Sequence, residues 1–320
     1  MTRHFLADTD ISSQEQADIL RLAAQLRRDR FARRPFDGPK TVAVLFDHPS
    51  TRTRVSFATG IAELGGHPLV LDGSGSQMGR GESVADTARV LSAMASMIVW
   101  RTPRQADLEE MAAHASIPVI NALTDAYHPC QILADLAAFG QSRDTIESSG
   151  PAFAGRVLTY LGDGANNMAN SYLLGGALAG MHVRIAAPAS HQPAEEVVEQ
   201  ARQTAQHTGG SVTITEDPRA ACEGAHLITT DTWVSMGQEG QTGRAESTFG
   251  RFQVTDELMD LGDDAVFMHC LPAYRGKEVT AAVIDGPRSL VWLEAENRLH
   301  AQKALMDVLA NASNREAQTV

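Results

Sequence analysis

Short runs of β-branched and apolar residues alternate along this chain with longer segments of helical apolar spacing. Such alternation is typical of βαβ units, in which helices connect the strands of a mainly parallel sheet. We therefore predict an α/β fold of two domains, each a mainly parallel sheet flanked by helices. The predicted strands fall into two sets, the first at 41–46, 67–71, 96–100 and 117–121, and the second at 156–161, 182–187, 211–215, 226–230 and 265–269.

The segment between the two sets of strands has the composition of a linker. It runs from Gln141 to Gly155 and carries Ser148-Ser149-Gly150-Pro151, a typical loop sequence. A chain of 320 residues is long enough for two domains. We predict one domain over residues 1–140 and a second over residues 151–295. The stretch from Glu294 to Asn311 has an apolar helical face that could pack on either domain.

The charge and the cysteine pattern exclude several classes of protein. The formal net charge is -12 and the pI is about 5.3, which argues against partners such as nucleic acid or an anionic membrane surface. No run approaches the roughly 18 to 20 apolar residues of a membrane span, and the first residues lack an apolar signal core, so we expect a cytoplasmic protein. Cys130, Cys222 and Cys270 are too widely spaced to suggest a disulfide framework or a zinc site, so we expect free thiols and no metal.

An anion-binding motif follows the first predicted strand. The residues are Ser50-Thr51-Arg52-Thr53-Arg54, directly before a segment of helical spacing. Hydroxyl side chains, first-turn N–H groups and guanidinium groups would meet there, as a phosphate requires. The alternative is a solvated helix start decorated with polar residues.

Other polar residues follow the predicted strands in the same way. Arg101 follows the third predicted strand, and His128 and Gln131 follow the fourth. Because ligands bind beyond the carboxyl ends of strands in open α/β sheets, these residues suit one small anion in the first domain. In the second domain the corresponding positions carry Asp231 and Cys270, which suit recognition of an amino acid.

Each of these residues also has an ordinary structural explanation. His128 alone would be a hydrogen-bonded residue near a helix start, Asp231 a cap, and Cys270 a small buried side chain. The segment Gly162-Asp163-Gly164 could open a dinucleotide-binding motif, but the third glycine and the acidic residue after the next strand are absent. We therefore predict no NAD and no other cofactor.

Taken together, these residues resemble the carbamoyltransferase family, in the branch that uses ornithine. The match covers nearly the whole chain. The segments that carry it are 50–54, 76–82 with Gln77, Arg101, 128–131, Asp231 with Ser235-Met236-Gly237, and His269-Cys270-Leu271-Pro272-Ala273. Two departures are His48, where relatives often carry lysine, and Tyr274, where many carry histidine.

The resemblance implies a set of residues for each substrate. It implies that a loop carrying Gln77 reaches a neighbouring subunit, so the assembly is a homotrimer or a higher multiple of trimers. It also implies that the C-terminal helix, 296–320, packs back on the first domain and brings Arg298 with it. The residues implied for carbamoyl phosphate are Ser50, Thr51, Arg52, Thr53, Gln77, Arg101, His128, Gln131, Cys270, Leu271 and Arg298.

For L-ornithine, the resemblance implies Asn167 and the Met236 backbone at the α-carboxylate, and Asp231 with Ser235 at the α-amino group. Asn166 is an adjacent competitor for the role of Asn167. Independently of the resemblance, a carboxylate such as Asp231 suits an amino acid with a basic side chain. The segment Gly237 to Gly250 is expected to be a loop beside this substrate.

The implied reaction is transfer of the carbamoyl group to the side-chain amine of L-ornithine, which gives L-citrulline and phosphate in arginine biosynthesis. Arg101, His128, Asp231 and Cys270 are the expected catalytic residues. Two alternatives stay open from the sequence: a carbamoyltransferase for another amine, such as putrescine, lysine or an acylornithine, and a non-catalytic paralogue that senses these ligands.

Overall fold

Two compact units make up the chain. A computed structural model describes residues 2–73, 81–143, 151, 153–233 and 242–317, without the side chains of 242–245 and 313–317. The first unit comprises Met1–Ala137 with Glu296–Val320, and the second comprises Ala138–Ala295. Each unit holds one parallel sheet, so the predicted fold class is confirmed. Every predicted strand is present within two residues of its expected bounds.

The first unit contains a four-stranded sheet in the order β2-β1-β3-β4. Its strands are β1 (Thr41–Phe46), β2 (His67–Asp72), β3 (Met97–Arg101) and β4 (Val119–Leu123). β1 and β3 are central and buried, whereas β2 is an exposed edge. The chain goes from β1 outward to β2 and then returns to the other side of β1 as β3. This reversal is a topological switch point, where α/β sheets leave a crevice beyond the strand ends.

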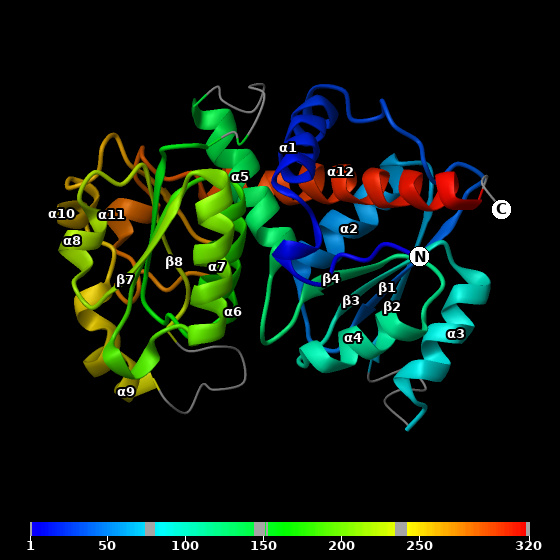
Figure 1. Cartoon of the computed structure of the whole chain (residues 1–320), viewed down its shortest axis with the longest axis horizontal. Helices are drawn as coiled ribbons and strands as arrows, with labels where there is room; N and C mark the ends of the chain where they lie inside the picture. The colour runs from blue at the N-terminus through cyan, green and yellow to red at the C-terminus, as the bar shows by residue number, and fades with distance from the viewer. Residues whose placement is uncertain (1, 74–80, 144–150, 152, 234–241, 318–320) are drawn as a thin grey trace. The chain divides into compact units, whose positions relative to one another are not determined.

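Helices cover both faces of the first sheet. α3 and α4 pack on the face that carries Ala43, Leu45 and Ile98, and α2 covers the other face (Figure 1). α5 and α12 each contribute residues to both units. The bounds are η1 (Asp8–Asp10), α1 (Ser13–Arg28), α2 (Thr51–Glu63), α3 (Val84–Met94), α4 (Gln105–His114), α5 (Pro129–Arg143) and α12 (Val291–Ala317).

The second unit contains a five-stranded sheet in the order β7-β6-β5-β8-β9. Its strands are β5 (Val157–Leu161), β6 (His182–Ala186), β7 (Ser211–Thr215), β8 (Leu227–Thr230) and β9 (Val266–Met268). The chain moves from β5 to β6 and β7 and then returns to the opposite side of β5 as β8. The switch point therefore lies between the carboxyl ends of β5 and β8.

Helices again cover both faces of this sheet. α6 and α7 lie on one face, and α8, α10 and α11 contribute to the apolar core on the other (Figure 1). One sequence expectation was wrong here, because residues 242–249 of the predicted loop form helix α9. The bounds are α6 (Asn167–Leu178), η4 (Ala189–His191), α7 (Glu195–Thr208), α8 (Pro218–Cys222), α9 (Thr242–Phe249), η6 (Gly250–Phe252), α10 (Asp256–Met259) and α11 (Ala281–Ile284).

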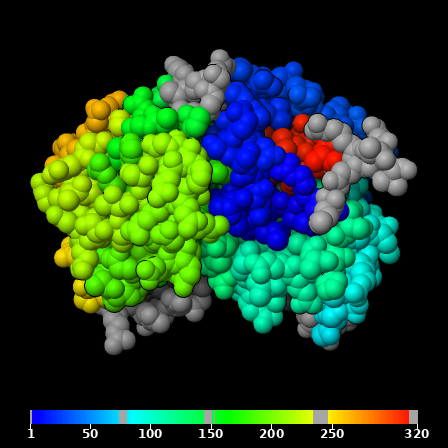
Figure 2. Space-filling model, viewed as in Figure 1, coloured from blue at the N-terminus to red at the C-terminus, as the bar shows by residue number. Residues whose placement is uncertain are grey.

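Within the first unit, α12 packs beside α1 and α2 (Figure 1). Figure 2 shows dark-blue N-terminal residues directly beside the red residues of α12. Lys303 of α12 is fully buried and donates to Glu63 Oε2 of α2 at 2.7 Å. Because Gly60 has no side chain, the Lys303 stem and Met306 can approach α2 closely at that point. The helix is thus fixed to α2 by both packing and charge.

Candidate active site

Helix α2 begins at the switch point of the first sheet. Ser50 is its N-cap, and the Ser50 hydroxyl accepts from the backbone N–H of Thr53 at 3.4 Å. Thr53 is buried on the first turn, whereas Thr51 is exposed. Unsatisfied first-turn N–H groups and the positive end of the helix dipole favour an anion at this end. The predicted phosphate motif therefore lies at a helix start.

Arg298 of α12 is held against this helix start by several oxygen acceptors. Its Nη2 donates to Thr53 Oγ1 at 3.1 Å, and its Nη1 donates to Gln131 Oε1 of α5. With the Gln302 amide oriented so that both of its ends are satisfied, the Gln302 oxygen accepts from Arg298 Nε and Nη2 at 3.2 Å. The structure therefore brings together Arg298, Thr53 and Gln131 from three separate parts of the sequence.

His128 lies buried directly before α5, in a strongly cationic environment. Burial lowers the pKa of its imidazole well below the usual value, and the charges of Arg298, Arg101 and Arg52 lower it further. The imidazole is therefore neutral near pH 7. Arg101 is also buried, at the end of β3, with its Nη1 3.5 Å from Ser50 Oγ. Three guanidinium groups around a neutral histidine form a site suited to a small anion.

Arg54, the second arginine of the Ser50–Arg54 motif, has a different role. Arg54 forms an ion pair with Asp72 at the end of β2, and its guanidinium lies over the Phe46 ring at 4.7 Å from the ring centre. It therefore joins α2 to the sheet. His48, one of the two sequence departures, is exposed on the loop before α2.

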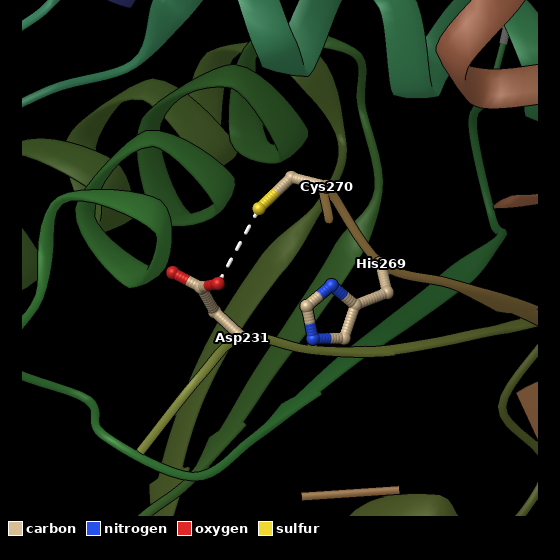
Figure 3. Close-up of side chains that lie close together, drawn as sticks. All are labelled: Asp231, His269 and Cys270. Carbon is tan, nitrogen blue, oxygen red and sulfur yellow. Dashed lines mark hydrogen bonds between the residues drawn. The ribbon is translucent and has the colours of Figure 1, made fainter. Parts of the chain in front are cut away.

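In the second unit, the ends of β8 and β9 bring Asp231 and Cys270 together (Figure 3). The Cys270 thiol donates to Asp231 Oδ1 at 3.3 Å, and the same oxygen accepts from the Thr232 N–H at 2.7 Å. The two residues are 39 positions apart in the sequence. Their contact follows from the parallel pairing of β8 with β9, which places both carboxyl ends at one edge.

His269 supports the backbone that carries Cys270. Its Nδ1 accepts from the Leu271 N–H at 2.9 Å, which assigns the ring proton to Nε2. Nε2 faces Glu278 Oε1 at 3.4 Å, and both side chains are buried. Leu271 has a φ of 56°, in the left-handed region that usually costs a non-glycine residue about 1–2 kcal/mol. The hydrogen bond to His269 stabilises that conformation.

Sequence analysis missed Glu278. The residue closes the charged segment Arg275-Gly276-Lys277-Glu278, a pattern typical of a solvated loop. The structure instead buries it, with Oε1 accepting from the Tyr274 N–H. Tyr274 itself, the second departure, is half exposed and beneath the Lys277 ammonium group.

Among the described residues, Asp231, His269 and Cys270 offer ligand atoms within 4.8 Å of one another. Such atoms can bind zinc. In this structure, however, His269 Nδ1 already accepts from Leu271, and Asp231 Oδ1 accepts from both Thr232 and Cys270. Asp231 and Cys270 are therefore a hydrogen-bonded pair, and His269 beside them is bonded to the backbone of Leu271.

The adjacent residues Asn166 and Asn167 occupy different positions in helix α6. Asn166 is the N-cap of α6: its Oδ1 accepts from the Ala169 N–H at 2.8 Å and its Nδ2 donates to the Tyr160 hydroxyl at 2.9 Å. Asn167 is the first residue of α6. Burial raises the pKa of the Tyr160 phenol well above its usual value, with the Asp231 charge as a further cause, so this hydroxyl stays protonated.

Gln77, Ser235 and Met236 lie outside the described residues. The remaining residues form two groups, one in each unit. The first contains Ser50, Thr51, Arg52, Thr53, Arg101, His128, Gln131 and Arg298, and the second contains Asn167, Asp231, Cys270 and Leu271.

Comparison with known families covers nearly the whole chain. Residues 3–141 match the carbamoyl-P binding domain of aspartate/ornithine carbamoyltransferase, and residues 154–309 match its Asp/Orn binding domain. The chain belongs to the aspartate/ornithine carbamoyltransferase family. The start of α2, Arg101, His128 and Gln131 therefore fall in the segment that matches the carbamoyl-P domain, and Arg298 and the Asp231–Cys270 pair fall in the Asp/Orn segment.

Individual members of the family are also closely similar. An ornithine carbamoyltransferase from Renibacterium salmoninarum is 58% identical over 318 residues, which is 98% of this chain and 100% of the relative. The structure of ornithine carbamoyltransferase from Pyrococcus furiosus is 42% identical, with a TM-score of 0.88 over 95% of this chain and 96% of that one. An anabolic ornithine carbamoyltransferase from Campylobacter jejuni is 35% identical, with a TM-score of 0.88 over 98% and 100%.

Proposed function

We propose that this chain is an ornithine carbamoyltransferase, which transfers the carbamoyl group of carbamoyl phosphate to the side-chain amine of L-ornithine. The products are L-citrulline and phosphate. The observation that carries the proposal is that Arg101 and Arg298 both reach the start of α2, at Ser50 and Thr53, in the unit that also buries His128. The charges of these two arginines and of Arg52 keep the pKa of His128 low. The names and the high identity of the relatives favour ornithine as the amine.

The first unit supplies most of the groups for carbamoyl phosphate. The N-terminus of α2 and its hydroxyl side chains suit the phosphate, and Arg101 and His128 suit the carbonyl oxygen, on which negative charge develops during attack. We assign this ligand to Ser50, Thr51, Arg52, Thr53, Arg101, His128, Gln131 and Arg298. The assignments of Gln77, Cys270 and Leu271 to the same ligand rest on the family resemblance.

The second unit supplies the groups for ornithine. Asp231 provides the negative charge that an amino acid with two ammonium groups requires, and Cys270 lies 3.3 Å from it. Asn167 keeps its proposed role at the α-carboxylate, because Asn166 is already engaged as the cap of α6. Ser235 and Met236 keep their proposed roles on the resemblance alone.

The proposed chemistry is direct acyl transfer. The side-chain amine attacks the carbonyl carbon, the new C–N bond forms, and the C–O bond to phosphate breaks with its electron pair on phosphate. A primary amine with a pKa near 10.4 costs about 4 to 5 kcal/mol to deprotonate at pH 7. We assign Asp231 and Cys270 to this proton, with the departing phosphate as its final acceptor.

A product assay with several amines tests the proposal. The purified protein is incubated with carbamoyl phosphate and, in separate reactions, ornithine, putrescine, lysine, N-acetylornithine or aspartate. We expect citrulline and phosphate in equal amounts with ornithine and no carbamoylated product from the other amines. Product from another amine would reassign the substrate, and no product from any amine would indicate a ligand-sensing paralogue.

We further propose a homotrimer, or a higher multiple of trimers. The support is the exposed edge strand β2, where Leu69 and Val70 are 39% and 38% exposed, with Val55 of α2 at 60%. An apolar, unpaired sheet edge of this kind is usually covered by a partner. Sedimentation equilibrium should give a mass of three times 34.3 kDa or a multiple of that, and a monomer would contradict the proposal.

We propose arginine biosynthesis in the cytoplasm as the setting. One structural relative is named an anabolic enzyme, and the three cysteines of this chain are free thiols, as reducing compartments favour. No helix among the described residues is long and apolar enough to cross a membrane. Restoration of growth without arginine, in a bacterium that lacks its own ornithine carbamoyltransferase, tests this setting.

A further inference from the structure

Gln131 is held between two buried groups of opposite charge. Its amide Nε2 donates to Asp135 Oδ1 at 2.7 Å, one helical turn further along α5, and its Oε1 accepts from Arg298 Nη1. Gln131 is 1% exposed, Asp135 0% and Arg298 3%. Hydrogen bonds to charged partners are stronger than those between neutral groups, and buried ones gain further from the low local dielectric.

This arrangement fixes the direction of the Gln131 amide. If the amide rotated by half a turn, its NH2 would face the guanidinium group and its oxygen would face the carboxylate, so both contacts would become repulsive. The carboxylate of Asp135 therefore selects the donor end, and the acceptor end is directed to the side of Arg298. Arg298 also bonds Thr53, on the first turn of the anion-binding helix.

The acceptor end has a clear chemical use at this site. Arg52, Arg101 and Arg298 are donors only, so they suit the phosphate and carbonyl oxygens of a ligand. They cannot accept a hydrogen bond from an NH2 group. A carbonyl oxygen can accept two hydrogen bonds, so an amide oxygen such as Gln131 Oε1 is the type of group that can accept from a ligand NH2.

We propose that Asp135 is a positioning residue that makes the site specific for a carbamoyl group over acyl groups without an NH2. Asp135 acts through Gln131, whose oxygen it keeps turned toward the NH2 of carbamoyl phosphate. This inference rests on the proposed function, because it assigns Gln131 to the carbamoyl end of that ligand. The ligand that the site discriminates against is a small acyl phosphate without an NH2 group, such as acetyl phosphate.

The test compares three ligands on the full-length protein. Carbamoyl phosphate has the NH2, acetyl phosphate has a methyl group in its place, and inorganic phosphate has only the anionic end. Their dissociation constants are measured by calorimetry on the wild type, Asp135→Ala and Asp135→Asn. Alanine removes the acceptor for Gln131, whereas asparagine keeps a neutral oxygen of the same size.

We expect Asp135→Ala to weaken carbamoyl phosphate roughly 10- to 100-fold, as for loss of a hydrogen bond between a charged and a neutral group. Acetyl phosphate and phosphate should stay within about threefold, because Thr53 and Gln302 still hold Arg298. Asp135→Asn should reduce the selectivity for carbamoyl over acetyl phosphate by about 3- to 10-fold, since a neutral acceptor is weaker.

A phosphate-end variant serves as the matched control. Thr53→Val removes a hydroxyl that bonds Arg298 and faces the phosphate site, so it should weaken all three ligands alike. A parallel weakening of all three ligands in the Asp135 variants would mean that Asp135 only supports the helix, and would overturn the proposal. An unchanged selectivity in a folded Asp135→Asn protein would also overturn it, even if Asp135→Ala does not fold.

The citrulline assay separates this inference from the proposed function. A wild type that binds carbamoyl phosphate selectively through Asp135 but forms no citrulline would disprove only the function. A wild type that forms citrulline, with Asp135 variants of unchanged selectivity, would disprove only the inference.

Discussion

We propose that the buried charge of Arg101 both orders the site and takes part in its chemistry. It lies at the end of β3, is 5% exposed, and helps to keep His128 neutral. Its Nη1 is near the Ser50 hydroxyl at the cap of α2. A guanidinium group held in this way needs no reorganisation when negative charge develops on the carbonyl oxygen of the ligand, and this preorganisation is the main source of electrostatic catalysis.

Replacing Arg101 should therefore slow turnover severely. We expect Arg101→Ala to lower kcat by roughly 100- to 1,000-fold, the loss typical of one oxyanion-stabilising donor. The matched control is Arg104→Ala, because Arg104 is exposed and pairs with Asp107 at the start of α4. Steady-state citrulline kinetics measure both variants. Near-normal turnover in Arg101→Ala would reject its catalytic assignment.

The three cysteines should differ sharply in reactivity. Burial raises the pKa of the Cys130 and Cys222 thiols to about 12, and both side chains are fully buried. Because alkylation requires an accessible thiolate, iodoacetamide should label only Cys270 in the native protein. Mass spectrometry of the peptides measures this, and Cys270→Ser should take up label only after denaturation. Comparable labelling of Cys130 would show that the first unit opens readily.

At the scale of elements, α12 places a distant part of the sequence at the anion site. Its Lys303 lies between α2 and the segment after α1, and donates to Glu63 and to the Arg30 carbonyl oxygen. Glu63 also pairs with Arg30. A buried charge that loses its partner is costly, whereas an intact buried pair is nearly neutral relative to apolar packing.

Lys303→Met should consequently destabilise the first unit. We expect a loss of about 3 kcal/mol in the free energy of unfolding, near the lower end of the range for broken buried pairs, because Arg30 still faces Glu63. Urea unfolding followed by circular dichroism measures the change. The double variant Lys303→Met with Glu63→Leu should recover part of the loss. If the double variant is no more stable than the single one, the buried carboxylate is not the cause.

At the scale of the whole molecule, buried histidines link stability to pH. Burial lowers the pKa of His300 to about 4 and that of His128 well below 6.5. In the unfolded chain these groups titrate near 6.5, so below that pH the unfolded state binds more protons than the folded state. The contribution of these neutral histidines to stability is fully present above pH 6.5. It is lost as the pH falls from 6.5 toward the pKa that each histidine has in the folded protein.

We expect His300 to remove about 2 kcal/mol of unfolding free energy between pH 7 and pH 5. His300→Gln tests this without touching the proposed binding groups, and should make the pH dependence shallower by about one proton. Urea unfolding at pH 7, 6 and 5 measures the slope for both proteins. Identical slopes would show that His300 titrates normally in the folded chain.

Much of the fold could be predicted from local sequence patterns. Runs such as 41–46 and 211–215 are strands because β-branched residues favour extended backbone and turn residues bound them. The helix α9 was missed because the segment Gly237 to Gly250 that contains it is rich in Gly, Gln and Ser, which is typical of a loop. For α12 the sequence showed one apolar face, yet residues 300–307 are all buried, including Lys303 and Gln302, because other elements of the first unit surround the helix.

The sequence by itself determined the parallel α/β architecture, the helix-start motif at Ser50 and the family, since these depend on order and spacing along the chain. Only the tertiary structure decided which side chains meet. In the structure Arg54 pairs with Asp72, and Asn166 caps helix α6. Glu278 is buried against His269, and Asp135 accepts a hydrogen bond from Gln131. The physical reason is that hydrogen-bond partners and burial depend on distances in space between residues far apart in the sequence, which local preferences do not encode.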